Sequence, residues 1–233
     1  MQDIHSVSEL GFGPTSKVLC IMPHPDDEAV FASGWLHSLV SAGVAVRVIV
    51  CTRGEKSSLR HGLTDTADLA TERYREQVAA FRVLGVQTYE IWKYPDGGLE
   101  SCQKELSQSI QTVMNQYQPS DLLVLEPDGV YGHPDHIVLT SIVQHLNRGR
   151  ASVWYLTVAP WHQHSSARAM AKKSVIQPVL PDYRLWLSPF QILLKYRTLA
   201  AHRSQFQLLP WQANTFAHFW RNSLWWSEFL ARG

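Results

Sequence analysis

Cysteine is scarce in this sequence. Among the 233 residues there are three cysteines, Cys20, Cys51 and Cys102, and no two of them lie close together in the chain. This pattern excludes a disulfide-rich secreted scaffold and a zinc knuckle built from paired cysteines. Cys20 and Cys51 stand inside apolar, β-like runs, so we predict that they are buried free thiols, as unpaired cysteines often are.

Long hydrophobic runs and an excess of one charge are also missing. No apolar run approaches the roughly 20 residues that a membrane-spanning helix needs. Segment 1–17 lacks the basic start and apolar block of a secretory signal. The formal net charge of +1 gives no electrostatic case for nucleic acid. We therefore expect a cytoplasmic protein that has no transmembrane segment and binds no nucleic acid. Peripheral membrane contact and homo-oligomerisation stay open.

What the sequence does contain is a regular alternation of short β-branched runs and longer helical patterns. We predict strands at 17–22, 44–51, 86–92, 121–126 and 152–158, and helices at 26–42, 65–85, 99–117 and 133–146. Strands and helices in strict turn are typical of a parallel sheet covered on both faces. The pattern therefore predicts an α/β protein with a Rossmann-like three-layer α/β/α fold and a mostly parallel sheet.

The last third of the chain is less regular. We expect a single domain over 1–233, in which an α/β core at 1–160 is followed by a C-terminal elaboration at 161–233. Helices are predicted there near 189–206 and 213–230. The tail is rich in tryptophan, and we expect these rings to pack against the sheet or across a dimer contact: Trp211, Trp220, Trp225 and Trp226.

Polar segments follow four of the predicted strands. They read PHPDDE at 23–28, TRGEKS at 52–57, YPDGG at 94–98 and EPDGVYGHPDH at 126–136. In open parallel sheets, ligands bind in the crevice outside the carboxyl ends of the strands. The four segments should therefore line one crevice.

Two of these segments share an H-P-D motif, His24-Pro25-Asp26-Asp27 and His133-Pro134-Asp135-His136. Each comes between a predicted strand and a predicted helix. Proline and a carboxylate both suit the first turn of a helix, so well-formed helix N-termini would explain part of the pattern. Helix capping does not call for histidine, however. Imidazole and carboxylate without thiolate favour zinc or another borderline divalent metal.

The spacing of the first motif fits a catalytic metal site. His24 and Asp27 are three residues apart, so both can approach one ion from a single turn, and a histidine of the second motif would complete three protein ligands. Such a site keeps one position open for a water, whose pKa falls to about 7 on zinc. Asp26 is adjacent but points elsewhere, so it is free to act as general base on that water.

The motifs and their surroundings resemble the PIG-L/LmbE family of zinc-dependent N-acetylglucosaminyl deacetylases. The resemblance includes PHPDDEAVFASGWLHSLVSAGVAVRVIVCTRGE at 23–55 and GVYGHPDHIVLT at 129–140. It extends through ERYREQVAAFRVLGV, YPDGGL and TLAAHRSQ, so it spans most of the chain. It implies an amidohydrolase that cleaves a linear N-acetyl bond of an N-acetylglucosamine-containing conjugate and releases acetate and a free amine.

Carried over position by position, the resemblance implies one zinc ion per chain, with Fe²⁺ as an alternative. The implied zinc ligands are His24, Asp27 and His136. Asp26 would be the general base. His133 would stabilise the tetrahedral intermediate or protonate the departing amine, and Tyr131 would polarise the amide carbonyl. Arg73 and Asp96 match positions that hold the sugar.

Each of the last four assignments has a simpler alternative. Arg73 could instead pair with Glu76 one helical turn away. Asp96 could only start the turn before two glycines. Tyr131 could be a packed loop aromatic, and His133 could be a capping or hydrogen-bonding histidine. The HRSQ segment at 202–205 resembles a family segment, but the sequence indicates no role for it.

Substrate identity is left open. Arg53, Lys56 and Arg60 lie in a loop predicted to flank the site, which favours an anionic group on the substrate. A metal-dependent hydrolase of another amide or of a phosphoester is one competing hypothesis. A non-catalytic sugar- or nucleotide-binding module is another, although no G-x-G-x-x-G motif follows the first strand.

Overall fold

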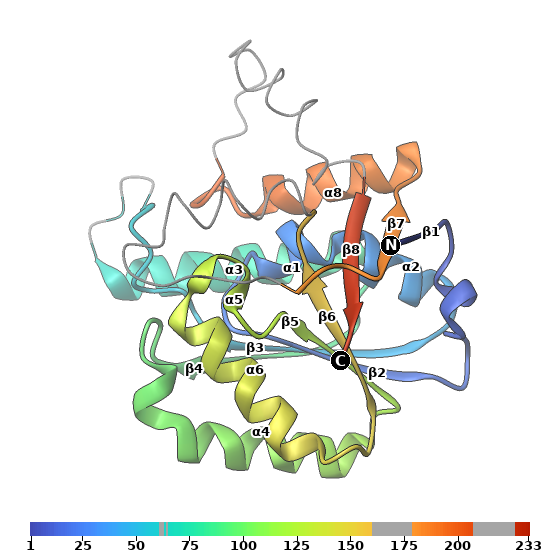
Figure 1. The fold of residues 1–233 in the computed structure, drawn as a ribbon. Helices are drawn as coiled ribbons and strands as arrows, with labels where there is room; N and C mark the ends of the chain where they lie inside the picture. Colours follow the sequence, from blue (N-terminus) through green and yellow to red (C-terminus); the bar gives the residue numbers. More distant parts are fainter. Residues whose placement is uncertain (61–62, 64, 160–178, 207–226) are drawn as a thin grey trace.

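A three-layer α/β/α arrangement is seen in the computed structural model (Figure 1). The structure describes residues 1–60, 63, 65–159, 179–206 and 227–233. The four tryptophans of the tail, Trp211, Trp220, Trp225 and Trp226, lie outside the described residues. Within the described residues, no helix is both long enough and apolar enough to cross a membrane.

The central layer is a sheet in the order β1-β7-β8-β6-β5-β2-β3-β4. Its strands are β1 (Gln2–Ile4), β2 (Lys17–Met22), β3 (Ala45–Thr52), β4 (Thr88–Tyr94), β5 (Asp121–Leu125), β6 (Ser152–Thr157), β7 (Tyr183–Trp186) and β8 (Ser227–Arg232). Among these described strands, β8 alone runs antiparallel to its neighbours, β6 and β7. The predicted mostly parallel sheet is confirmed.

Helices cover both faces of the sheet. One face carries α1 (Asp27–Phe31), α2 (Ser33–Ser41), α3 (Thr66–Leu84) and α8 (Pro189–Ala201), and the other carries α4 (Gln103–Tyr117) and α6 (Pro134–Asn147). Three short helical segments complete the described elements: η1 (Val7–Leu10), η2 (Leu99–Cys102) and α5 (Gly129–Gly132). Each face therefore has its own layer of helices.

Two hydrophobic cores follow from the alternation of side chains along the strands. On β2, Cys20 and Met22 point into the core that contains Trp35 of α2 and Phe81 of α3. The intervening Ile21 points into the opposite core, which the apolar side chains of α4 and α6 complete. A strand buried on both faces explains why β2 is a continuous apolar run.

The structure corrects three details of the predicted elements. The helix predicted at 26–42 is two helices, α1 and α2, broken at Ala32. Residues 227–230, predicted as the end of a helix, belong to strand β8, because Phe229, Leu230 and Ala231 are buried between β6 and β7. Strands β1 and β7 are too short for their sequences to have indicated them.

Candidate functional site

The four predicted segments meet in one cavity at the carboxyl ends of the strands. The cavity has a volume of about 430 Å³ and is lined by all four, including His24, Lys56, Asp96 and His133. It lies beside β2 and β5, the pair of strands at which the order of the sheet reverses direction. Crevices at such a switch point are the usual ligand sites of open α/β sheets.

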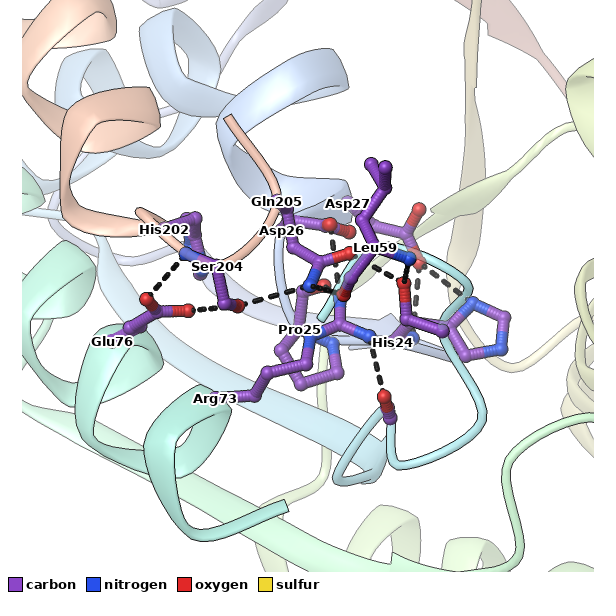
Figure 2. A network of polar contacts seen from close by, with 12 residues as sticks. His24, Pro25, Asp26, Asp27, Leu59, Arg73, Glu76, His202, Ser204 and Gln205 are labelled. Atoms are coloured by element: carbon purple, nitrogen blue, oxygen red, sulfur yellow. Dashed lines mark hydrogen bonds and ion pairs between the residues drawn. The ribbon is translucent and has the colours of Figure 1, made fainter. Parts of the chain in front are cut away.

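The first motif sends its two aspartates in different directions (Figure 2). Asp26 precedes α1 with φ of 93°, in the left-handed region that a non-glycine residue rarely adopts. Its Oδ2 accepts a hydrogen bond of 2.9 Å from Arg73 Nη2. Asp27 begins α1, and its Oδ2 accepts a bond of 3.0 Å from the His24 backbone N–H. The two carboxylates are therefore available for separate tasks.

The second motif forms the start of α6. The His133 ring caps this helix, since its Nδ1 accepts a hydrogen bond of 3.2 Å from the Asp135 N–H, and Pro134 occupies the first turn. The capping alternative for His133 is thus realised. It engages one ring nitrogen and leaves Nε2 for other contacts, so capping does not preclude a second role.

A strained turn presents the second motif to the cavity. Val130 has φ of 65°, which a β-branched residue rarely adopts. The buried Glu126 carboxylate accepts hydrogen bonds from the Val130 N–H and, at 3.2 Å, from the Asp128 N–H. Backbone strain of this kind persists where surrounding contacts enforce it, and it gathers at functional sites.

Three side chains from the two motifs converge at short distances. His24 Nδ1 lies 3.3 Å from His136 Nε2. Asp27 meets each ring with a different oxygen, Oδ2 at 3.5 Å from His24 Nδ1 and Oδ1 at 3.7 Å from His136 Nε2. Tetrahedral zinc with bonds of about 2.1 Å separates its ligand atoms by about 3.4 Å. The separation of the two nitrogens agrees with this value, whereas the two Asp27 distances involve different carboxylate oxygens.

Two further groups of potential ligands share His24. Ligand atoms of His24, His133 and His136 lie within 4.8 Å of one another, as do those of His24, Asp96 and Asp135. The second group uses the opposite nitrogen of His24: Nε2 is 3.1 Å from Asp135 Oδ2 and 3.2 Å from Asp96 Oδ1. Metal-bound histidines usually donate their other ring N–H to a carboxylate. We therefore interpret Asp96 and Asp135 as residues that orient His24.

Asp135 is itself held in place. Its Oδ2 accepts a hydrogen bond of 2.7 Å from the Gly97 N–H, and its Oδ1 accepts one of 3.1 Å from the Leu99 N–H. These bonds tie the start of α6 to the YPDGG loop. The orientation of the His24 ring therefore depends on a loop that the first motif does not contain.

Burial and the clustered carboxylates shift the pKa values in the site. Burial lowers the pKa of His24, but hydrogen bonds to Asp135 and Asp27 outweigh it and raise the pKa well above its usual value. Burial lowers the pKa of His136 to about 3 despite the nearby Asp27 carboxylate. Burial also raises the pKa of Asp26 to about 6, although the Arg73 guanidinium opposes this shift. The carboxylates thus favour a positively charged His24 ring, whereas His136 stays neutral.

The remaining predicted residues also line the cavity. The Tyr131 ring centroid lies 5.2 Å from that of His136. Arg73 is buried and donates to the Gly54 and Pro25 carbonyls and to Asp26, so the alternative helical pair with Glu76 is not what holds it. Asp96 Oδ2 accepts a hydrogen bond of 2.8 Å from the Lys56 N–H. Contact of these three residues with a sugar stays a prediction.

The structure also brings in residues that the sequence interpretation had not assigned to the site. They are Glu28, Gln77, Glu126, Asp135, His202, Ser204 and Gln205. His202 and Glu28 are fully buried and joined by a hydrogen bond of 2.8 Å. Glu28 belongs to the PHPDDE motif and His202 to the HRSQ segment, so both residues stand in motifs that the sequence displays. The sequence did not indicate that the PHPDDE and HRSQ segments are in contact.

Two curated relatives resemble the chain in sequence. A 1D-myo-inositol 2-acetamido-2-deoxy-alpha-D-glucopyranoside deacetylase of Corynebacterium kroppenstedtii is 32% identical over 146 residues, which cover 51% of this chain and 37% of the relative. A diacetylchitobiose deacetylase of Thermococcus kodakarensis is 32% identical over 126 residues, which cover 54% of this chain and 46% of the relative. The matched part thus spans less than half the length of each relative.

Solved structures share the fold over almost the whole chain. The N,N'-diacetylchitobiose deacetylase of Pyrococcus horikoshii superposes with a TM-score of 0.70 at 22% identity, covering 100% of this chain and 95% of the other. The 4-carboxy-2-hydroxymuconate hydratase of Pseudomonas putida superposes with a TM-score of 0.61 at 17% identity. The fold by itself therefore does not specify deacetylation.

The sequence match to a family profile is more specific than the fold. The PIG-L profile, described as GlcNAc-PI de-N-acetylase, matches residues 19–147. This range runs from β2 to the end of α6 and includes both H-P-D motifs and the YPDGG loop between them. By this match the chain belongs to the PIG-L family of GlcNAc-PI de-N-acetylases.

Proposed function

We propose that this protein is a zinc-dependent hydrolase that removes the N-acetyl group from an N-acetylglucosamine-containing conjugate and releases acetate and a free amine. The observation that carries the proposal is the convergence of His24, Asp27 and His136 at the cavity, with a separate carboxylate, Asp26, beside them. Family membership and the deacetylase names of the relatives support it.

We assign the metal to His24 Nδ1, the Asp27 carboxylate and His136 Nε2. When bound, the ion supplies Lewis acidity that polarises the amide carbonyl and acidifies a water. The donor set of two imidazoles and one carboxylate suits zinc, and Fe²⁺ is the alternative that metal analysis must separate. One ion per chain is expected, with His24 Nε2 held by Asp135 and Asp96 and not by a second ion.

Asp26 is assigned as general base. Its Oδ2 is occupied by the Arg73 guanidinium at 2.9 Å. Oδ1 bonds to none of the residues that the structure describes, so we assign the proton of the attacking water to this oxygen. The Arg73 bond fixes the plane of the carboxylate, and a fixed base raises the fraction of encounters with correct geometry.

His133 and Tyr131 are assigned as hydrogen-bond donors to the negative charge that develops on the amide oxygen during hydrolysis. His133 Nδ1 accepts the Asp135 N–H, so the neutral ring carries its hydrogen on Nε2 and can donate it to the oxyanion or the departing nitrogen. Burial and nearby carboxylates raise the pKa of Tyr131, which keeps its hydroxyl protonated as a donor. A correctly placed donor of this kind is typically worth about 3 kcal/mol in the transition state.

Asp96 and Arg73 are assigned as residues that bind the sugar of the substrate. Both line the cavity, but both already bond within the protein: Asp96 to Lys56 N–H and His24, Arg73 to two carbonyls and Asp26. Replacing either residue could therefore affect substrate binding, protein structure or both, and the experiment must separate these effects. Conservative replacements that raise KM without altering metal content would support contact with substrate.

The anionic-substrate hypothesis narrows to one side chain. Lys56 lines the cavity, whereas Arg53 lies 4.9 Å from the centroid of the Tyr74 ring and Arg60 is not among the described residues that line the cavity. We keep Lys56 as the candidate contact for an anionic group on the conjugate. Equal kcat/KM on a neutral and a phosphorylated N-acetylglucosamine conjugate would rule out this hypothesis.

The cytoplasmic location stays a prediction.

The decisive experiment combines metal analysis with an acetate-release assay over a panel of N-acetylglucosamine conjugates. We expect one zinc per chain and stoichiometric release of acetate and amine from at least one conjugate. Metal content without acetate release, but with release of another acid from other amides, would favour a different amidohydrolase. Sugar binding without metal and without turnover would favour a non-catalytic module.

A further inference from the structure

The HRSQ segment at 202–205 reaches two sides of the site from the end of α8 (Figure 2). His202 Nε2 donates a hydrogen bond of 2.8 Å to Glu28 Oε1, across 174 residues of sequence. Both side chains are fully buried. Neither residue is among those that line the cavity, so we look for the effect of this contact in the residues that Glu28 holds.

Glu28 holds the backbone of Asp26. The Asp26 N–H donates to Glu28 Oε2 at 3.2 Å and to Gln77 Oε1 at 3.3 Å. Asp26 has φ of 93°, a conformation that non-glycine residues avoid and that persists only when surrounding contacts enforce it. This conformation directs the Asp26 carboxylate away from Asp27. The orientation of Asp26 therefore depends on Glu28, and the orientation of Glu28 depends on His202.

Gln205 holds one wall of the cavity. Its Oε1 accepts a hydrogen bond of 2.6 Å from Ser57 Oγ, and its Nε2 donates one of 3.0 Å to the Leu59 carbonyl. Ser57, Leu59 and Gln205 all line the cavity. The loop at 57–59 has no regular secondary structure, so these bonds from another segment define its position.

Ser204 fixes the segment to α3 between these two contacts. Its N–H and Oγ donate to the two oxygens of the buried Glu76 carboxylate at 2.7 and 2.6 Å. Arg203, by contrast, leaves 76% of its side chain exposed and forms a long surface ion pair of 3.6 Å with Glu72. His202, Ser204 and Gln205 thus face the interior, and Arg203 faces the surface.

We propose that His202 and Gln205 are positioning residues, His202 for Asp26 through Glu28 and Gln205 for the cavity wall at 57–59. The proposal rests on the proposed deacetylase function for its kinetic consequences. The two residues would act on different steps: Asp26 is the proposed base in bond cleavage, whereas the 57–59 wall lines the cavity in which substrate would bind. Their replacement should therefore alter different kinetic constants.

The kinetic test compares His202→Ala, His202→Gln, Gln205→Ala and the matched control Arg203→Ala. His202→Ala should lower kcat about 10- to 100-fold with little change in KM, as expected when a catalytic group is displaced by up to an ångström. His202→Gln keeps an N–H donor and should restore most of kcat. Gln205→Ala should mainly raise KM, and Arg203→Ala should change neither constant. Should His202→Ala not fold, His202→Leu, which lacks the donor but fills the space, takes its place.

A second measurement does not depend on turnover. Hydrogen exchange of the backbone amides in segment 24–30 should accelerate in His202→Ala relative to Arg203→Ala, with metal content retained. If the wild type releases no acetate from any conjugate, the proposed function fails while this comparison still decides the positioning role. Exchange in 24–30 equal to that of the control would overturn the proposal. So would an equal kcat, or a kcat loss that His202→Gln does not reverse.

Discussion

His24 Nδ1 and His136 Nε2 lie 3.3 Å apart although 112 residues separate them in the sequence. The two rings follow β2 and β5, which are adjacent parallel strands whose carboxyl ends open at the same edge of the sheet. The distance is that of a hydrogen bond between two imidazole nitrogens, and a carboxylate oxygen of Asp27 lies near each ring. The fold therefore brings two separate H-P-D motifs together at one place.

Replacement of Asp26 and replacement of Asp27 should affect metal binding and activity differently. Asp27→Asn weakens the metal donor set, so we expect loss of both bound metal and activity. Asp26→Asn keeps the donors and removes the proposed base, so metal content should stay at the wild-type level while kcat falls about 10²- to 10⁴-fold. Metal analysis and acetate release on the same preparations check both outcomes. Metal loss in Asp26→Asn comparable to that in Asp27→Asn would contradict the separation of roles.

Removal of the metal should lower stability as well as activity. The proposed ligands are His24, just after β2, Asp27 in α1 and His136 in α6, so a bound ion links elements that are distant in sequence. A ligand at 100 times its Kd stabilises the native state by about 2.7 kcal/mol. We expect a chelator to lower Tm and abolish acetate release, and added zinc to restore both. Asp27→Asn serves as the control, and a chelator-induced Tm shift of wild-type size in that variant would contradict the assignment.

Much of the fold could be predicted from local patterns. The apolar run 17–22 became β2, and the amphipathic pattern at 65–85 became α3, which ends at Gly85 with φ of 76° as a C-terminal cap. Parallel topology then required the polar segments to share one edge of the sheet, so the cavity followed from the strand pattern alone. These features depend on short-range chemistry, which the sequence displays directly.

Contacts across long separations could not be predicted in the same way. Nothing local to His202 indicates that its partner is Glu28, and a helix predicted over 213–230 became in part the strand β8. The conformation of Asp26 is another example, because a left-handed aspartate is disfavoured locally and is stabilised by Glu28 and Gln77. Tertiary contacts decided each of these cases.

The buried pair Lys195 and Glu228 should respond unequally to removal of either partner. Lys195 Nζ lies 2.7 Å from Glu228 Oε1, and both side chains are almost fully buried. The Glu228 carboxylate also accepts hydrogen bonds from the Gly34 and Trp35 N–H groups at the start of α2. Glu228→Ala should cost about 3–5 kcal/mol, because it leaves a buried ammonium unpaired. Lys195→Met should cost less, because the helix N–H groups still satisfy Glu228.

Urea denaturation of the two variants measures the difference in their free energies of unfolding. Arg184→Met, which breaks an exposed ion pair with Asp3, is the matched surface control and should cost no more than about 1 kcal/mol. Equal destabilisation by Glu228→Ala and Lys195→Met would mean that the contacts of Glu228 with α2 contribute little.

Thiol reactivity should report the burial of the two cysteines on β2 and β3. Cys20 and Cys51 are fully buried, and burial raises the pKa of both thiols, so neither forms thiolate readily. Cys102 is the partly exposed one. Of the three cysteines in the chain, a thiol reagent should modify at most Cys102 in the native protein and all three after denaturation. Rapid native modification of Cys20 would contradict the packing of β2.

Replacement of Gly129, in the turn before the second motif, tests whether the conformation of this turn positions His136. Gly129 has φ of 71°, and a Cβ added there would lie 3.0 Å from Ile137 Cγ1 and 3.1 Å from His136 Cβ. Gly149→Ala is the matched control, because Gly149 has a similar φ of 74° and open space around it. Both variants should lose about 1–2 kcal/mol from the left-handed conformation. Only Gly129→Ala should also displace His136, and so lower zinc affinity and acetate release. Calorimetry of unfolding and zinc titration separate the two effects, and wild-type zinc affinity in Gly129→Ala would show that His136 tolerates movement of the turn.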